Sequence, residues 1–140
     1  MAYDPDNIFA RILRGELPST RVYEDDETLA FMDIMPRVPG HVLVIPKTPC
    51  RNLLDASGAQ LAACMATTQK LSHAVMKAFG AGGVTVQQFN ETIGGQEVFH
   101  LHFHVLPRRE GDRLLPPGHM GDKEEIAAHA EKIRAVLADG

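Results

Sequence analysis

The chain has 140 residues, of which 44% are hydrophobic and 23% are charged. This composition is that of an ordinary globular protein, and the length predicts one domain over residues 1–140 with a core of its own. The net charge of -4 gives no sign of the broad basic face that nucleic-acid binding needs. No apolar run approaches the ~20 residues of a membrane span, and the first residues lack the features of a secretory signal. We therefore expect a cytoplasmic protein without nucleic-acid or membrane partners.

The two cysteines, Cys50 and Cys64, form neither a CxxC pair nor a zinc-ribbon spacing. Isolated cysteines in such a chain are typical of free thiols in a reducing compartment. We expect no disulfide.

The first half of the chain predicts a short helix followed by three strands. The segment 4–6 opens the helix with a carboxylate cap, and Gly15 suits the position just past its end. Residues 21–24 and 28–34 predict a hairpin around the acidic turn Asp25-Asp26. A buried strand over residues 41–45 is expected to stop at Pro46.

The second half predicts a long helix, two further strands and a last helix. Ser57 and Gln60 fit a capping box before a helix over about 59–79. Strands are expected at 84–90 and 100–106, joined by a glycine-containing loop over residues 91–95. An irregular stretch over residues 107–121 leads to the last helix, where Asp122 and Glu125 fit a second capping box. The order predicts an α+β domain with about five mostly antiparallel strands and the long helix packed on one face.

Three histidines stand at alternate positions between residues 96 and 107, namely His100, His102 and His104. In a strand they share one face, while the apolar residues between them bury the other. Three partly polar rings on an apolar strand cost free energy unless they have a task, which argues against a purely structural role. Imidazoles suit metal binding or nucleophilic and acid–base chemistry near neutral pH.

Two kinds of site fit this row. Alternating histidines can place two nitrogens on zinc or a similar ion, with His41 as a further candidate ligand. A neutral imidazole is also a competent nucleophile toward phosphorus. Just upstream, residues 94–98 (Gly-Gly-Gln-Glu-Val) can turn sharply and present successive N–H groups to an anion. This donor loop favours phosphate chemistry.

The segment Gln96-x-Val98-x-His100-x-His102-x-His104-Val105-Leu106 resembles the signature of the histidine triad (HIT) family of nucleotide hydrolases and transferases. The segments 7–18, 24–34 and 39–47 resemble the opening of its Hint branch and bacterial relatives, so the likeness covers residues 7–107 in order. Residues 108–140 then form a C-terminal extension with a helix.

The resemblance implies a HIT-like fold and a role for each matching residue. His102 matches the nucleophile that forms a covalent nucleotidyl-histidine and releases a nucleoside monophosphate such as AMP. His100 and His41 match histidines that hold the nucleophile in its working tautomer, and His104 matches the one near the leaving group. Asp33 matches the ribose ligand. The family's apolar base slot matches Ile8, Phe9, Ile12, Phe31 and Ile34, and its phosphate contacts match Asn90 and the backbone of Gly95, Gln96, Glu97 and Val98.

The resemblance further implies a purine nucleotide phosphoramidase or nucleotidyl hydrolase that forms a homodimer. Two positions depart from the pattern. Ala10 stands where many bacterial relatives carry a zinc-ligating cysteine, so we expect no cofactor. Glu97 stands where the Hint branch has a serine, and its carboxylate is expected to point away from a bound anion. A metal-binding protein using the histidine row and a non-catalytic nucleotide-binding regulator remain the alternatives.

Overall fold

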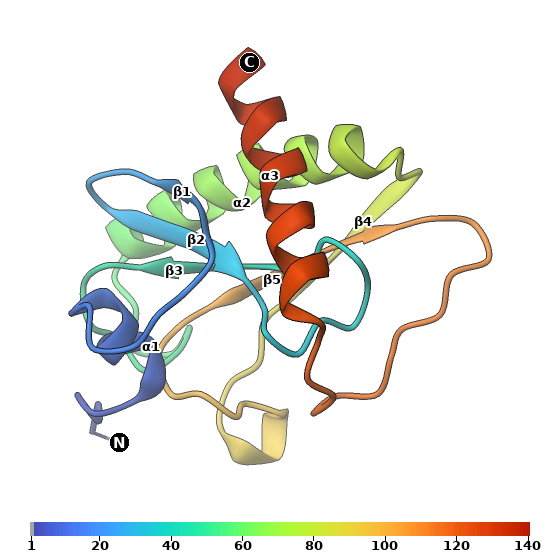
Figure 1. Ribbon diagram of the computed structural model, residues 1–140. Coiled ribbons are helices and arrows are strands. Elements are labelled where there is room, and N and C mark those ends of the chain that lie inside the picture. Colours follow the sequence, from blue (N-terminus) through green and yellow to red (C-terminus); the bar gives the residue numbers. More distant parts are fainter. Residues whose placement is uncertain (1) are drawn as a thin grey trace.

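The computed structural model describes residues 2–140 and confirms the α+β architecture. Five antiparallel strands form one sheet in the order β1-β2-β3-β5-β4 (Figure 1). The strands are β1 (Arg21–Glu24), β2 (Thr28–Met32), β3 (Val42–Pro46), β4 (Gly83–Gln87) and β5 (Phe103–Arg108). The α-helices are α1 (Ile8–Leu13), α2 (Gly58–Phe79) and α3 (Lys123–Asp139), with a short 3-10 helix, η1 (Thr92–Gly94). Within residues 2–140 no helix has the length and apolar character to cross a membrane.

The central strands β2 and β3 are buried at every position, because each face of the sheet is covered. On one face, Ala30, Met32, Val42 and Val44 pack with buried residues of α2 and α3 (Figure 1). On the other face a smaller cluster joins the sheet to α1, formed by Leu29, Phe31, Leu43, Ile45, Phe9 and Ile12. Residues of the histidine segment lie at the rim of this smaller cluster, where Phe9 meets His102.

Local hydrogen bonds confirm several of the predicted element ends. Ser57 and Gln60 form a reciprocal capping box at α2. In the hairpin turn, the Asp25 carboxylate accepts from the backbone N–H groups of Glu27 and Thr28. At α3 the Asp122 side chain caps Glu125 N–H, but no return bond from the Glu125 side chain is present in the described residues, so only half of the second box forms.

Three predicted ends were wrong by a few residues, for reasons of hydrogen bonding. Helix α1 begins after Asn7, whose amide oxygen caps Ala10 N–H, rather than after an aspartate. Strand β2 stops at Met32 because the Asp33 side chain accepts from Met35 N–H and turns the chain. Strand β3 includes Pro46, which pairs with Thr28 at the end of the ladder, where a missing N–H does little harm.

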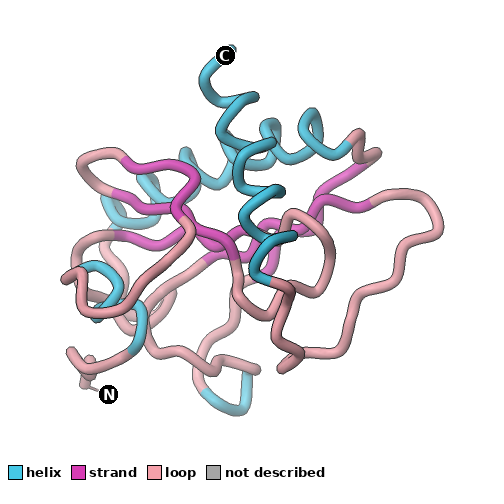
Figure 2. Tube along the Cα trace, in the orientation of Figure 1, coloured by secondary structure: helices cyan, strands magenta, loops and turns pink. Residues whose placement is uncertain are grey.

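The strands on either side of the donor loop differ from the prediction, because one is shorter and the other is shifted along the chain. Strand β4 ends at Gln87, three residues early, and Gln88 to Asn90 instead bond through their side chains. Strand β5 begins at Phe103 and runs through Arg108, so His100 and His102 precede it. No strand is available to pair with them, since the β3 ladder ends at Phe103 and the β4 ladder at His104. After β5 the chain follows a long loop without regular structure to α3 (Figure 2).

Both cysteines are free and buried. Burial raises the pKa of the Cys50 thiol to about 11 and that of Cys64 to about 12. These thiols are protonated core side chains at neutral pH.

Candidate active site

His102 presents one unprotonated nitrogen to the site. Its Nδ1 lies 2.7 Å from the backbone carbonyl of His100, which can only accept, so Nδ1 carries the proton. Burial lowers the pKa of His102 to about 4, and the ring is therefore neutral at pH 7. A neutral ring protonated at Nδ1 has its lone pair on Nε2. The backbone thus fixes the tautomer that a nucleophile needs.

His41 and His104 form a directed pair. The Arg37 N–H donates to His41 Nδ1 at 3.1 Å, which leaves the proton of the neutral ring on Nε2. His41 Nε2 lies 2.9 Å from His104 Nδ1 and donates to it, so His104 carries its own proton on Nε2. Burial lowers the pKa of His41 to about 4 and that of His104 to about 3. His104 is a neutral donor beside His102, with ring centroids 5.1 Å apart.

His100 is the most deeply placed of the three histidines. Its Nε2–H donates to the Pro46 carbonyl at 2.8 Å, and its Nδ1 accepts from the Tyr3 hydroxyl at 2.7 Å. Both ring nitrogens are therefore used inside the protein, and burial lowers the pKa of this ring as well. His100 supports His102 through its backbone carbonyl rather than through its ring.

These contacts revise the expected division of labour. His41 was predicted to hold the nucleophile, but it bonds to His104, 63 residues away in sequence. The predicted single face of three imidazoles is also wrong for His100, whose ring meets Tyr3. The reason is that His100 and His102 lie before β5, where the strict alternation of a strand does not apply.

Asp33 lies beside the His41–His104 pair. One carboxylate oxygen is 3.4 Å from His41 Nε2, but His41 is neutral, so the contact is not an ion pair. Burial raises the pKa of Asp33 to about 6, opposed by the Met35 N–H and reinforced by the nearby Glu97 carboxylate. Asp33 is thus a half-buried acceptor beside the histidine cluster, and the exposed Glu97 is close enough to influence it electrostatically.

The predicted base slot divides into buried and exposed residues. Phe9, Ile12 and Phe31 belong to the packed core below the sheet. Phe9 also meets His102 edge-on, with ring centroids 4.9 Å apart. Ile8 and Ile34 are about half exposed and offer apolar surface on this side.

The donor loop offers two free amides. Within it, Gly94 and Gln96 N–H donate to the Glu91 carbonyl, and Gly95 N–H donates to Thr92. In residues 2–140 no acceptor takes the N–H groups of Glu97 and Val98, so these two can face an anion. Gly95 is required here, because its φ is +101° and a Cβ would lie 3.2 Å from the Phe89 ring. Phe89 in turn packs against His104.

Two predicted phosphate contacts are engaged inside the protein. The Asn90 amide oxygen accepts from Leu53 N–H and Gln88 Nε2, and its amide nitrogen donates to Gln88 Oε1. Among residues 2–140 the second amide hydrogen of Asn90 has no partner. The Gln96 side chain is buried and makes four hydrogen bonds, to Glu91, Asn52, Arg51 and Val98. The prediction for Gln96 concerned its backbone, but the Gln96 N–H donates to the Glu91 carbonyl, as the Gly95 N–H does to Thr92, so these two amides are not free for a phosphate. The task of the Gln96 side chain is to hold the loop.

The model of the HIT domain matches residues 14–111, about seven-tenths of the chain. The chain is a member of the HIT family. HIT proteins are nucleotide-binding hydrolases and transferases.

Relatives and solved structures agree with this membership. A HIT-like protein of Methanocaldococcus jannaschii is 41% identical over 75% of this chain and 81% of its own length. Adenylylsulfatase HINT3 of Arabidopsis thaliana is 37% identical over 91% of this chain, which spans 62% of that protein. The crystal structure of a Hit-like protein involved in cell-cycle regulation from Bartonella henselae, solved with an unknown ligand, is 52% identical. It superposes with a TM-score of 0.92 over 98% of this chain and 100% of that one.

A zinc-bound HIT protein of Mycobacterium smegmatis is 34% identical, with a TM-score of 0.86 over 96% of this chain and 94% of that one. In this chain, Ala10 has no donor atom where many bacterial HIT proteins carry a cysteine ligand, and both ring nitrogens of His100 are bonded within the protein. Among residues 2–140, the one group of three ligand atoms close together is that of Asp33, His41 and His104. The residues around Ala10 do not fit a structural zinc.

The sequence patterns missed the residues that fix this geometry. Tyr3, Arg37 and Pro46 set the histidine tautomers, two of them through backbone atoms that no side-chain motif can reveal. Arg51 and Glu91 hold the donor loop from positions 40 residues apart. A local signal existed only for Glu91, which lies three residues before the loop.

Proposed function

We propose that this protein cleaves nucleoside phosphoramidates or related nucleotidyl conjugates through a covalent nucleotidyl–His102 intermediate and releases a nucleoside monophosphate. The observation that carries the proposal is the Nε2 lone pair of His102, which is fixed by the His100 carbonyl. The ring of His104, which carries its proton on Nε2, packs against His102, and the free amides of Glu97 and Val98 lie in the segment that leads to His102. Together they offer a nucleophile, a donor for the departing group and an anion site.

In the first step His102 Nε2 attacks the α-phosphorus and the bond from phosphorus to the leaving nitrogen breaks. The leaving nitrogen takes up a proton from solvent and departs as an amine, while His104 Nε2–H donates a hydrogen bond on that side. In the second step water attacks the phosphorus and releases a proton to solvent, the bond from phosphorus to Nε2 breaks, and His102 returns to its neutral form. Two displacements of this kind are each easier than direct attack by water.

The nucleoside would lie over the α1 side of the sheet. Asp33 is ionised at pH 7 and accepts hydrogen bonds from ribose hydroxyls in this proposal. The half-exposed Ile8 and Ile34 would cover the purine, and the core residues Phe9 and Phe31 would support it from below. The buried environment strengthens the polar contacts made there.

The direct test is turnover of adenosine 5′-phosphoramidate with release of AMP. The variants His102→Asn and His102→Ala should lose essentially all activity, because no other imidazole has a free lone pair aimed at the site. His73→Asn, at an exposed position on α2, is the matched control and should act like the wild type. Near wild-type rates in both His102 variants would contradict the proposal.

The related substrate class follows from the plant relative, whose name is adenylylsulfatase. The same attack at the α-phosphorus of adenosine 5′-phosphosulfate would release sulfate and AMP. Comparing turnover of the phosphosulfate and the phosphoramidate identifies the leaving group that the site prefers. Tight AMP binding with no turnover of either compound would instead favour a nucleotide-binding regulator.

The alternative of a metal-binding protein finds less support. Ligand atoms of Asp33, His41 and His104 lie within 4.8 Å of one another. A metal needs the Nε2 lone pair of His41, but the Arg37 N–H at Nδ1 keeps the proton of the neutral ring on Nε2. Of the three row histidines, only His102 Nε2 offers a free lone pair. Undiminished turnover in chelator supports a metal-free reaction, and stoichiometric metal that is lost on triad mutation would contradict it.

We further propose a homodimer in which β4 of one subunit pairs with β4 of the other. Strand β4 is at the sheet edge, and Val86 on it is 44% exposed. Such an edge is a ready template for strand pairing. Light scattering after size exclusion should give a molar mass twice that of the chain. In Val86→Lys the measured mass should fall toward that of a single chain. A monomeric wild type would contradict this assembly.

A further inference from the structure

Glu91 has a backbone conformation that belongs to glycine. Its φ of 64° and ψ of 161° make it the only non-glycine residue with positive φ among residues 2–140. For a residue with a side chain this backbone conformation is strained, and it persists only where the surroundings enforce it. The position directly precedes η1, three residues before the donor loop begins at Gly94. A carboxylate is nevertheless present where a glycine would be free of strain.

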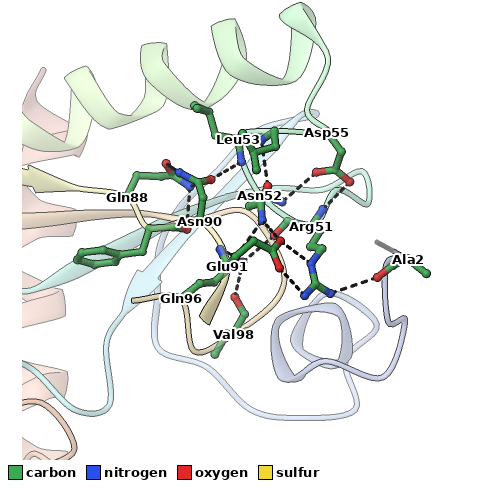
Figure 3. A network of polar contacts seen from close by, with 12 residues as sticks. Ala2, Arg51, Asn52, Leu53, Asp55, Gln88, Asn90, Glu91, Gln96 and Val98 are labelled. Carbon is green, nitrogen blue, oxygen red and sulfur yellow. Dashed lines mark hydrogen bonds and ion pairs between the residues drawn. The ribbon is translucent and has the colours of Figure 1, made fainter. Parts of the chain in front are cut away.

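The Glu91 side chain is held by three strong hydrogen bonds (Figure 3). Arg51 donates from Nε and Nη2 to the two carboxylate oxygens, at 2.8 and 2.9 Å, and Asn52 Nδ2 adds a bond of 2.6 Å. The fork of Arg51 therefore matches the carboxylate with two bonds, the strongest arrangement for such a pair. Arg51 and Glu91 side chains are only 20% and 24% exposed.

Arg51 is itself fixed on its other sides. Its guanidinium lies over the Phe99 ring, 4.2 Å from the centroid, and Nη1 donates to the Ala2 carbonyl. Phe99 directly precedes His100. The clamp therefore connects the segment after β3, the N-terminal segment and the histidine segment.

The Glu91 backbone is held from the opposite side by Gln96. The Gln96 amide oxygen accepts Glu91 N–H at 2.8 Å, and the Glu91 carbonyl accepts from the N–H groups of Gly94 and Gln96. The Gln96 amide nitrogen reaches Arg51 and Val98 carbonyls, on either side of the loop. One residue with strained φ thus anchors the turn that ends in the two free amides of Glu97 and Val98.

We propose that Arg51 and Glu91 are positioning residues that hold this strained turn so that the Glu97 and Val98 amides point at the phosphate. The inference rests on the proposed function, because it needs a phosphate at these amides. Without the clamp Glu91 relaxes to an ordinary negative φ, and the turn that it anchors rotates the two amides away. Neither residue touches the nucleotide. The two residues should therefore affect the binding of the phosphate group and not the binding of the nucleoside.

The test compares the affinities of AMP and adenosine, measured by calorimetry, in the wild type and in Arg51→Ala. Loss of one strained conformation corresponds to about a tenfold change in affinity. AMP should therefore bind to Arg51→Ala about tenfold more weakly than to the wild type, and adenosine should bind to both with the same affinity. Arg108→Ala is the matched control, because Arg108 makes a similar forked pair with Asp112 away from the loop. It should leave the affinity ratio of the two ligands unchanged.

Repeating Arg51→Ala in a second parent protein, Glu91→Gly, distinguishes a positioning role of Arg51 from a general effect on stability. Glycine adopts the Glu91 conformation without strain, so in the Glu91→Gly background the further change Arg51→Ala should have little effect on AMP affinity. If Arg51→Ala does not fold, Arg51→Lys replaces it, since lysine keeps the charge but cannot form the fork. The same loss in both backgrounds, or an unchanged ratio of AMP to adenosine affinity in the folded variant, would overturn the inference. If the wild type itself bound AMP no better than adenosine, the proposed function would fail instead.

Discussion

The histidine cluster and the donor loop are built in opposite ways. The tautomers of His102 and His41 are set by backbone groups, the His100 carbonyl and the Arg37 amide. The donor loop is held by the side chains of Arg51, Glu91 and Gln96. Substitution cannot remove a backbone carbonyl, but it can remove a guanidinium or an amide. The nucleophile is therefore protected from most single changes, and the anion site is not.

The two regions also differ in charge. The rings of His41, His100 and His102 are buried, that of His104 is half-buried, and all four are held neutral. In the loop, the Arg51 guanidinium lowers the pKa of Glu91, so this pair stays ionised. A neutral cluster suits nucleophilic attack, because a protonated imidazole has no lone pair to offer. An ionised pair suits a strained turn, since charged hydrogen bonds are about twice as strong as neutral ones.

Among the substitutions that probe how the two regions are held, the largest effect is expected for Gln96→Leu, which replaces the side chain by one of similar size but leaves four polar partners unpaired. Leaving buried partners unsatisfied should cost about 3 kcal/mol of unfolding free energy and weaken AMP binding as well. Chemical denaturation and calorimetry measure the two effects. Gln69→Leu, at an exposed position on α2, is the control. Equal stability of the two variants would show that the donor loop is not held by the Gln96 side chain.

The pH dependence of stability tests the histidine side of the comparison. As the pH falls from about 6.5 to 4, the unfolded chain takes up protons at His41, His102 and His104 that the folded protein does not bind, so stability falls. Asp33 acts in the opposite direction, because its folded pKa of about 6 lies above its usual value. Together the unfolded chain binds about two protons more than the folded protein. This difference predicts that the free energy of unfolding falls by roughly 2 to 3 kcal/mol per pH unit between pH 6 and 4.

Urea unfolding at several pH values measures this slope. His104→Asn should make it shallower by about one proton, since that ring no longer titrates in either state. A midpoint that does not move between about pH 7 and 5 would contradict burial of neutral histidines.

A smaller effect is expected for Tyr3→Phe, which removes the hydroxyl bonded to His100 Nδ1. The loss should be about 1 kcal/mol in stability and a few-fold in kcat, since His100 orients His102 only through its backbone. Tyr23→Phe is the matched control, because that hydroxyl bonds to Asp25 in the hairpin. It should cost similar stability without changing kcat. A complete loss of activity in Tyr3→Phe would show that the backbone alone does not fix the nucleophile.

The smallest effect is expected for Glu97→Gln. Removing this carboxylate takes away one cause of the raised pKa of Asp33, so the acid limit of AMP binding should move to lower pH by less than one unit. Binding at pH 7 should strengthen slightly, because a negative charge beside the anion site is gone. Glu110→Gln, in the loop after β5, is the control. An unchanged acid limit would place the Glu97 carboxylate too far away to matter.

Local patterns in the sequence predicted most of the fold. The Ser57–Gln60 box and the Asp25 turn each involve residues a few positions apart, and both form as expected. The same reasoning failed at the ends of β4 and β5. There the end of a strand depends on where its partner strand stops, which no local pattern records.

For the site, the sequence by itself determined which residues are available: the histidine row, His41, Asp33 and a glycine loop ahead of the row. It also determined family membership, since these motifs follow one another in a fixed order. Only the tertiary structure decided how they are used. The His41–His104 pair and the Arg51–Glu91 clamp join positions 63 and 40 residues apart. Such pairs depend on how sheet and loops pack, and that packing gives each chemically equivalent imidazole its own proton and its own partner.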